Sequence, residues 1–123
     1  MRAPRDRGAV AVEFALVVPL LIALLFAVVE GGTRYAQQHQ VDHWAFLTAR
    51  DLSIDPTKNA TTVVDALKGS DTTSYSVSAS PAGYCSSPST SAVTVTVSAT
   101  HSSLTGLFGS YTIKGKGVAR CEN

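Results

Sequence analysis

An apolar run near the start of the chain limits what it can fold into more than any other feature. From Ala9 to Val29 the sequence has 21 residues and one charged side chain, Glu13. As an α-helix this run would extend roughly 31 Å, which matches the hydrocarbon core of a bilayer. We therefore predict a membrane-spanning helix over residues 9–29.

Basic residues flank this run unequally. Arg2, Arg5 and Arg7 precede it, whereas Arg34 follows it. Because positive flanks stay in the cytoplasm, we predict a cytoplasmic N-terminus and an extracytoplasmic C-terminal part. A secretory signal has a shorter apolar core and a small-residue cleavage site. This run is longer and ends at Val29-Glu30-Gly31 without such a site, which favours a helix that stays in the membrane.

The single carboxylate of the run points to a more specific class of protein. A charge inside a membrane span is costly and calls for a partner or a purpose. Glu13 lies five residues after Gly8, in the sequence Arg7-Gly8-Ala9-Val10-Ala11-Val12-Glu13-Phe14. This segment resembles the processing site of type IV pilin-like precursors. With Ala15–Leu21, which follows, it more specifically resembles the TadE-like family of the Tad/Flp pilus system, over residues 7 to about 35.

The resemblance implies a function without catalysis, that of a minor pilin or pseudopilin. A prepilin peptidase would cut between Gly8 and Ala9. Glu13 and Phe14 would serve assembly, with Glu13 facing the free Ala9 amine of a neighbouring subunit and fixing the register. The implied partners are the membrane, the peptidase, other Tad/Flp pilins and the inner-membrane assembly platform with its ATPase. The sequence departs from common pilins at Ala9, where Phe or Met is more usual, and at Phe14, where Flp major pilins have Tyr.

Two other functions remain open. One is a permanently anchored, uncleaved single-pass protein whose outer domain binds a partner at the cell surface, with Glu13 hydrated at the interface and paired with Arg7. The other is a secreted enzyme released by cleavage after Val29. Pro19, in the middle of the run, leaves the carbonyl of Ala15 without its helical partner. It predicts a kink, or a locally unwound segment that helps extraction from the bilayer.

The remaining part of the chain, about 90 residues, is enough for one small domain. We divide the chain into a basic cytoplasmic leader (1–8), the membrane helix (9–29), a helical extension or stalk (30–54) and a small head (55–123). The expected fold class is α+β: a long N-terminal transmembrane helix with a head of one short helix and a three-stranded antiparallel sheet.

Two apolar stripes at helical spacing predict helices beyond the membrane. Residues 33–52 form the first, with the stripe Val41, Ala45, Thr48 and Leu52 and Trp44 alongside. Asp55-Pro56 is a typical helix start and Gly69 a typical end, which predicts a second helix between them. Its apolar face comprises Ala60, Val63, Val64 and Leu67.

Alternation of apolar and polar residues then predicts three strands, around 75–79, 93–100 and 111–121. Alternation of this kind is typical of an antiparallel sheet with one face on helices and the other toward water. Gly115 and Gly117 in the third strand indicate a bulge or a close backbone approach. Residues 80–91 read as a loop. In the connection 101–110, we expect the apolar residues to fold back onto the core or to form a contact patch; they are Leu104, Leu107 and Phe108.

Few residues suggest other chemistry. Cys85 and Cys121 are the two cysteines, and on the outer side of a membrane we expect them to form a disulfide, worth on the order of 3–4 kcal/mol. His39 and His43 have the spacing of two metal ligands, but Gln40 stands where a zincin motif has its glutamate, so we interpret them as a polar helix face. With ten basic and nine acidic residues and no basic stripe, nothing favours nucleic acid. We expect no metal, cofactor or small-molecule substrate.

Overall fold

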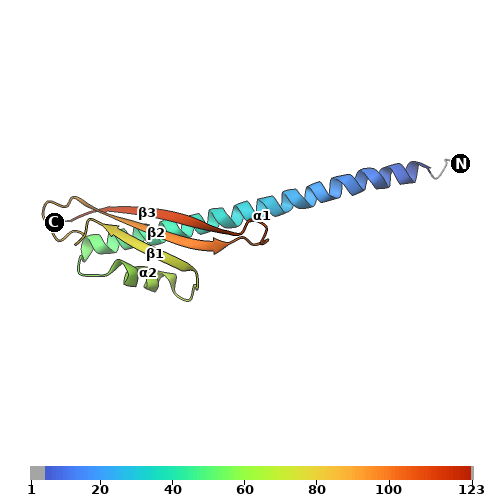
Figure 1. Cartoon of the computed structure of the whole chain (residues 1–123). Helices are drawn as coiled ribbons and strands as arrows, with labels where there is room; N and C mark the ends of the chain where they lie inside the picture. Colours follow the sequence, from blue (N-terminus) through green and yellow to red (C-terminus); the bar gives the residue numbers. More distant parts are fainter. Residues whose placement is uncertain (1–4, 123) are drawn as a thin grey trace. The chain divides into compact units, whose positions relative to one another are not determined.

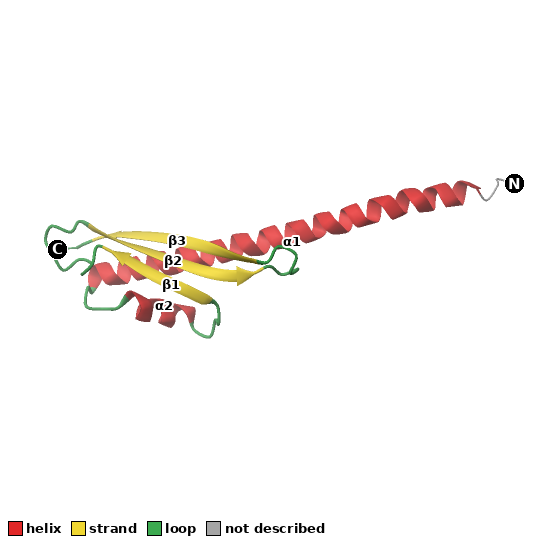
Figure 2. Ribbon diagram, in the orientation of Figure 1, coloured by secondary structure: helices red, strands yellow, loops and turns green. Residues whose placement is uncertain are grey.

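The computed structural model describes residues 5–122 and has the predicted α+β fold (Figure 1). Figure 2 shows the order of its elements along the chain. They are α1 (Arg5–Ile54), α2 (Ala60–Lys68), β1 (Ser74–Ser80), β2 (Ala92–Ser102) and β3 (Ser110–Arg120). The chain divides into two compact units, Met1–Thr33 and Arg34–Asn123. We call them the N-terminal unit and the head unit; α1 runs through both.

The described part of the N-terminal unit is helical and exposes apolar side chains in every direction. Large side chains from Val10 to Val29 are about half exposed or more, and Val18 is the one residue of intermediate exposure between Arg7 and Val29. The helix is continuous through Pro19 and through the glycine pair at 31–32. Within residues 5–122, α1 is the helix long and apolar enough to cross a membrane. A helix that is apolar all round needs an apolar surrounding, which a bilayer supplies.

The head unit is built on an antiparallel sheet in the order β1-β2-β3. The register is unbroken: β1 pairs with β2 through Val77↔Val97, and β2 pairs with β3 through Val97↔Gly115. From Val93 to Ala99 every second residue of β2 is fully buried, namely Val93, Val95, Val97 and Ala99. The alternate residues are mostly Ser and Thr and lie on the opposite face. The sheet therefore has one buried and one polar face, as the alternation predicted.

The C-terminal part of α1 covers the buried face. Its stripe matches the sequence prediction: Val41, Trp44, Ala45, Thr48 and Leu52 are all at most 4% exposed. A stripe of this kind, repeated every three or four residues, turns a single helix face toward the sheet. The core of the head unit lies between this face and β2.

Two glycines of β3 let α1 approach the sheet very closely. A Cβ added at Gly115 would lie 2.6 Å from the carbonyl carbon of Val41, and one at Gly117 would lie 2.3 Å from the carbonyl oxygen of Ala45. The pairing of β2 with β3 shows no bulge at either position. Of the two roles predicted for these glycines, close backbone approach is the one the structure shows.

The second helix begins later than predicted. Asn59 is the N-cap of α2, and its side-chain oxygen accepts a hydrogen bond from the Thr61 N–H at 2.9 Å. The prediction that Asp55 caps this helix is wrong, because its carboxylate instead accepts hydrogen bonds from the Thr57 N–H and Oγ1 in a turn. The predicted end is confirmed: Gly69, at φ 61°, is the C-cap, and its N–H donates to the Asp65 carbonyl.

The connection between β2 and β3 is shorter than predicted, since β2 continues to Ser102 and β3 starts at Ser110. We call residues 103–109 the hairpin tip. Its three large apolar side chains do not fold back onto the core, because Leu104, Leu107 and Phe108 are 68%, 80% and 66% exposed. Of the two expectations for these residues, folding onto the core is wrong, and they lie together on the surface of a seven-residue loop.

Candidate assembly segment

The predicted cleavage site lies in the first turns of α1. The structure places Gly8 and Ala9 in helical conformation, and both are exposed. Glycine weakens a helix by roughly 1 kcal/mol relative to alanine, so the helix unwinds more readily at Gly8 than it would at an alanine. Cleavage inside a helix requires such local unwinding. Residues 1–4 of the predicted basic leader, including Arg2, lie outside the described residues.

Glu13 lies on the same helix face as Ala9. Both are exposed, and residues four apart in a helix stand one above the other, about 6 Å apart along the axis. Arg7 precedes Glu13 by six residues, a spacing that places the two on different faces. Ala9 and Glu13 therefore share one face of α1, one turn apart, and Arg7 lies on another face. Phe14 is 69% exposed beside it.

Pro19 lies within α1 without ending it. Proline has no N–H, so the carbonyl of Ala15 lacks the hydrogen bond that a regular helix would give it. In lipid, where water does not replace the missing donor, this carbonyl is the weakest point of the apolar run. Kinking and local unwinding at this position both remain predictions.

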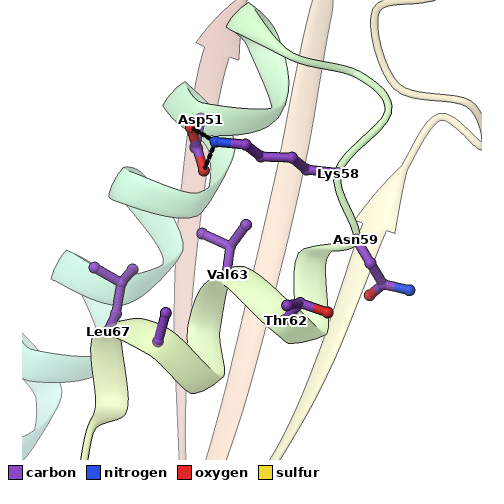
Figure 3. Close-up of a pocket in the computed structure, with 7 residues that line it drawn as sticks. Asp51, Lys58, Asn59, Thr62, Val63 and Leu67 are labelled. Atoms are coloured by element: carbon purple, nitrogen blue, oxygen red, sulfur yellow. Dashed lines mark hydrogen bonds and ion pairs between the residues drawn. The ribbon is translucent and has the colours of Figure 1, made fainter.

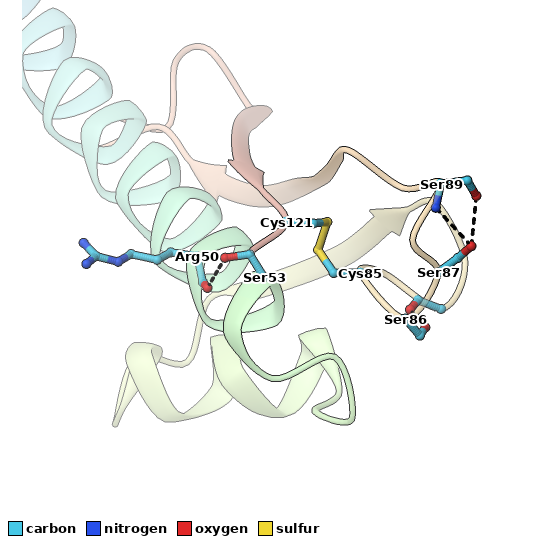
Figure 4. Close-up of a disulfide and its surroundings, with 8 residues drawn as sticks. Arg50, Ser53, Cys85, Ser86, Ser87, Ser89 and Cys121 are labelled. Atoms are coloured by element: carbon cyan, nitrogen blue, oxygen red, sulfur yellow. Dashed lines mark hydrogen bonds between the residues drawn. A yellow bond between two sulfur atoms is a disulfide. The ribbon is translucent and has the colours of Figure 1, made fainter. Parts of the chain in front are cut away.

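In the head unit, Cys85 and Cys121 are joined by a disulfide (Figure 4). Their Cα atoms are 5.4 Å apart, within the ordinary range for this bond. Cys121 follows β3 directly, and its N–H donates to the Ser91 carbonyl at 3.1 Å, beside the start of β2. The bond thus ties the long loop between β1 and β2 to the C-terminal end of the sheet. Cys85 is 6% exposed.

An open hollow of about 430 Å³ beside α2 was not predicted from the sequence (Figure 3). Lys58 and Asp51 close one side of it, with Nζ 2.8 Å and 3.0 Å from the two carboxylate oxygens. This hydrogen bond to Asp51 raises the pKa of Lys58 above its ordinary value. Val63 and Leu67 form its apolar floor. Both belong to the predicted apolar face of α2, but the sequence did not show that they stay only partly covered.

The histidine pair lies on the exposed surface of α1. His39 and His43 are both exposed, and the ring of Tyr35 meets that of His39 edge-on at 4.4 Å. Over residues 5–122 the structure has no group of three or more His, Cys, Asp or Glu side chains that could hold a metal ion. The arrangement is that of a polar helix face.

The chain was compared with known protein families. The family described as TadE-like protein matches residues 8–50. The match begins at Gly8 and includes Glu13, Pro19 and the part of α1 that packs on the sheet. No curated protein and no solved structure matches the chain. The TadE-like match indicates a protein associated with a Tad pilus and anchored by a membrane helix. Over residues 8–50 the chain is therefore similar to the TadE-like family, as the resemblance read from the sequence predicted.

Proposed function

We propose that this protein is a minor pilin or pseudopilin of a Tad/Flp pilus, without catalytic activity, processed after Gly8 by a prepilin peptidase. One observation carries the proposal. The apolar run 9–29 of an exposed helix contains a single carboxylate, Glu13, which lies five residues after a glycine. The TadE-like match over residues 8–50 supports it. The basic residues before the helix favour a cytoplasmic N-terminus and a head unit on the outer side.

Processing would change the electrostatics of the helix end. Cleavage removes the basic leader and leaves a charged amine at Ala9, next to an apolar run. When such helices bundle, the amine and Glu13 are withdrawn from water together. Two opposite charges 4 Å apart attract by about 4 kcal/mol at an effective dielectric constant of 20. A buried charge whose partner is removed costs about 3–5 kcal/mol, so only an axial offset that pairs the charges is stable.

The apolar surface of the helix explains what bundling would bury. Between Val10 and Val29 every large apolar side chain except the partly covered Val18 is exposed. In the membrane lipid covers it, and in a filament neighbouring helices would do so. Assembly would proceed with other pilins and the inner-membrane platform, and Pro19 would lower the cost of withdrawing the helix from lipid.

Replacing Glu13 with Gln tests this function. The variant keeps the size of the side chain but removes its charge, so the Ala9 amine is left unpaired in a bundle. We expect normal membrane insertion and normal cleavage after Gly8, with recovery of other pilins by co-purification reduced at least tenfold. The matched control is Glu122→Gln, which removes an exposed carboxylate near the C-terminus, outside the apolar helix.

The outcomes separate the proposal from its rival. A permanent anchor needs no charge at this depth, so wild-type recovery of other pilins with Glu13→Gln would contradict the register pair. Retention of residues 1–8 in the mature protein would contradict processing itself.

A further inference from the structure

The hairpin tip exposes three large apolar side chains within seven residues. Leu104, Leu107 and Phe108 are two-thirds exposed or more. Large apolar side chains exposed this close together in the chain point to a contact with another protein or with a membrane. From the sequence we expected these residues either to fold back onto the core or to form a contact patch, and their exposure favours the patch.

The tip is held in a defined shape by its own backbone. The Ser103 N–H donates to the Gly109 carbonyl at 2.8 Å, and the Gly106 N–H donates to the Ser103 carbonyl at 3.3 Å. The Phe108 N–H donates to the buried Ser103 Oγ at 3.3 Å. Gly106 and Gly109 have φ values of 71° and 64°, which residues with a side chain rarely adopt. These backbone groups are therefore hydrogen-bonded within the loop, while its apolar side chains point away from the core. Because fewer polar groups would lose hydrogen bonds to water, the free-energy cost of moving the loop into an apolar surrounding is lower.

A cation joins the tip to the start of the head unit. The Arg34 guanidinium lies 4.2 Å from the ring centroid of Tyr111 and 5.8 Å from that of Phe108. Arg34 is the first residue of this unit and follows Val29, the end of the apolar run, by five residues. Five residues span about 7.5 Å as a helix and at most ~18 Å fully extended. Arg34, which contacts the ring of Phe108, is therefore separated from the apolar run by only a short length of chain.

We propose that the hairpin tip inserts Leu104, Leu107 and Phe108 into the outer headgroup–acyl boundary of the bilayer that α1 spans. This inference rests on the membrane anchoring in the proposed function. Arginine with an exposed aromatic residue is the combination found at membrane interfaces, and Arg34 is followed by Tyr35, which is 68% exposed. The guanidinium would meet lipid phosphates while the tip enters the acyl region. The head unit would then contact the membrane at two points, the helix and the tip.

Tryptophan reporters in the full chain, reconstituted in phosphatidylcholine vesicles, test this contact. Phe108→Trp places a fluorophore at the tip, and Leu107→Trp is a second reporter should the first disturb the contact with Arg34. The matched control is Ser89→Trp, in the loop before β2, because the 11-residue β2 separates the two loops by about 36 Å. Leu25→Trp reports insertion of the helix. The signal of Trp44, which is 4% exposed, is subtracted using the unmodified protein.

We expect lipids brominated near the glycerol end of the acyl chain to quench both tip reporters at least twofold. Acrylamide should reach Ser89→Trp but not the tip. If Leu25→Trp is quenched by lipid while the tip remains open to acrylamide, the proposal is overturned and the anchor stands. If lipid quenches neither Leu25→Trp nor the tip reporters, both the tip proposal and the membrane anchoring are contradicted. A tip shielded from acrylamide and lipid alike would indicate a protein partner or a second copy, which also overturns the proposal.

Discussion

Replacing Gly117 with Ala should destabilise the head unit far more than an alanine elsewhere in β3. The added Cβ would lie 2.3 Å from the Ala45 carbonyl oxygen, whereas ordinary contact begins at 3.4 Å. The obstacle is helix backbone, which no side-chain rotation relieves. The helix would have to retreat from the sheet by about 1 Å, and a gap of this size forfeits a quarter to a half of each dispersion contact across it.

The size of the destabilisation depends on the contacts that this movement of α1 would disturb. The face of α1 that approaches Gly117 also buries Val41, Trp44 and Leu52 against the sheet. Overpacking a core costs 1–3 kcal/mol, and displacement of a whole helix belongs at the upper end, about 3 kcal/mol. For a unit of about 90 residues this lowers Tm by roughly 12–24 °C. Thermal unfolding in detergent, followed by Trp44 fluorescence, measures it.

The matched control is Lys116→Ala, one residue earlier, whose side chain points away from α1. We expect it to change stability by less than about 0.5 kcal/mol. A second test is non-additivity: once Gly117→Ala has displaced the helix, Gly115→Ala should cost less than it does alone. A loss below 1 kcal/mol for Gly117→Ala, or strict additivity of the two glycine variants, would refute the close-approach reasoning.

Three further predictions concern the head unit. Thr48→Val should raise the stability by about 1 kcal/mol in chemical denaturation, because the fully buried Thr48 Oγ1 has no hydrogen-bond partner within the described structure; a loss would refute this. Replacing both Cys85 and Cys121 with Ser should cost about 3–4 kcal/mol, and peptide mapping without reductant should recover the linked pair, not free thiols. The Tyr75 hydroxyl donates a hydrogen bond to Asp65, which raises the pKa of Tyr75 from 10.0 to about 12. The folded pKa lies above the unfolded value, so this contribution to stability is complete below pH 10 and lost as pH rises toward 12. Ultraviolet titration should show a lower pKa of Tyr75 in Asp65→Asn, and an unchanged one would contradict the assigned cause.

The architecture followed from the sequence wherever one face of an element is fully buried. The alternation of Val93, Val95 and Val97 predicted β2, and the stripe through Ala45 and Leu52 predicted the face of α1 that packs on it. In both, every buried position is apolar or small, so periodicity carries the information. The glycines of β3 predicted either a bulge or a close backbone approach, and the structure shows the close approach.

The predicted start of α2 was wrong because two residues in this segment can each cap a helix. Asp55 and Asn59 are both good N-cap residues, and the choice depends on backbone angles that the sequence does not reveal. In the structure Asn59 is extended, at φ −95° and ψ 129°, and caps α2, while Asp55 forms a turn with Thr57. The hydrogen bond from Thr57 lowers the pKa of Asp55, which is consistent with its carboxylate acting in the turn.

The expectation that the hairpin tip folds onto the core was wrong for a different reason. Its apolar residues resemble core residues in composition, and sequence patterns assume that such residues are buried within the chain. Their exposure is explained only when a bilayer is considered as a second apolar phase. In the proposed function the same holds for Glu13, whose role in an apolar helix would depend on a processed N-terminus and on neighbouring helices.

The central claim is that the chain becomes a pilin by cleavage between Gly8 and Ala9. Intact-mass measurement and N-terminal sequencing of the protein from its native membrane test this most directly. We expect a mature chain that begins at Ala9. We also expect precursor to accumulate when Gly8 is replaced by Leu, since the residue before the cut must fit the peptidase. A mature chain that begins at Met1 would contradict processing and favour a permanent anchor. One that begins beyond Val29 would contradict the membrane helix as well.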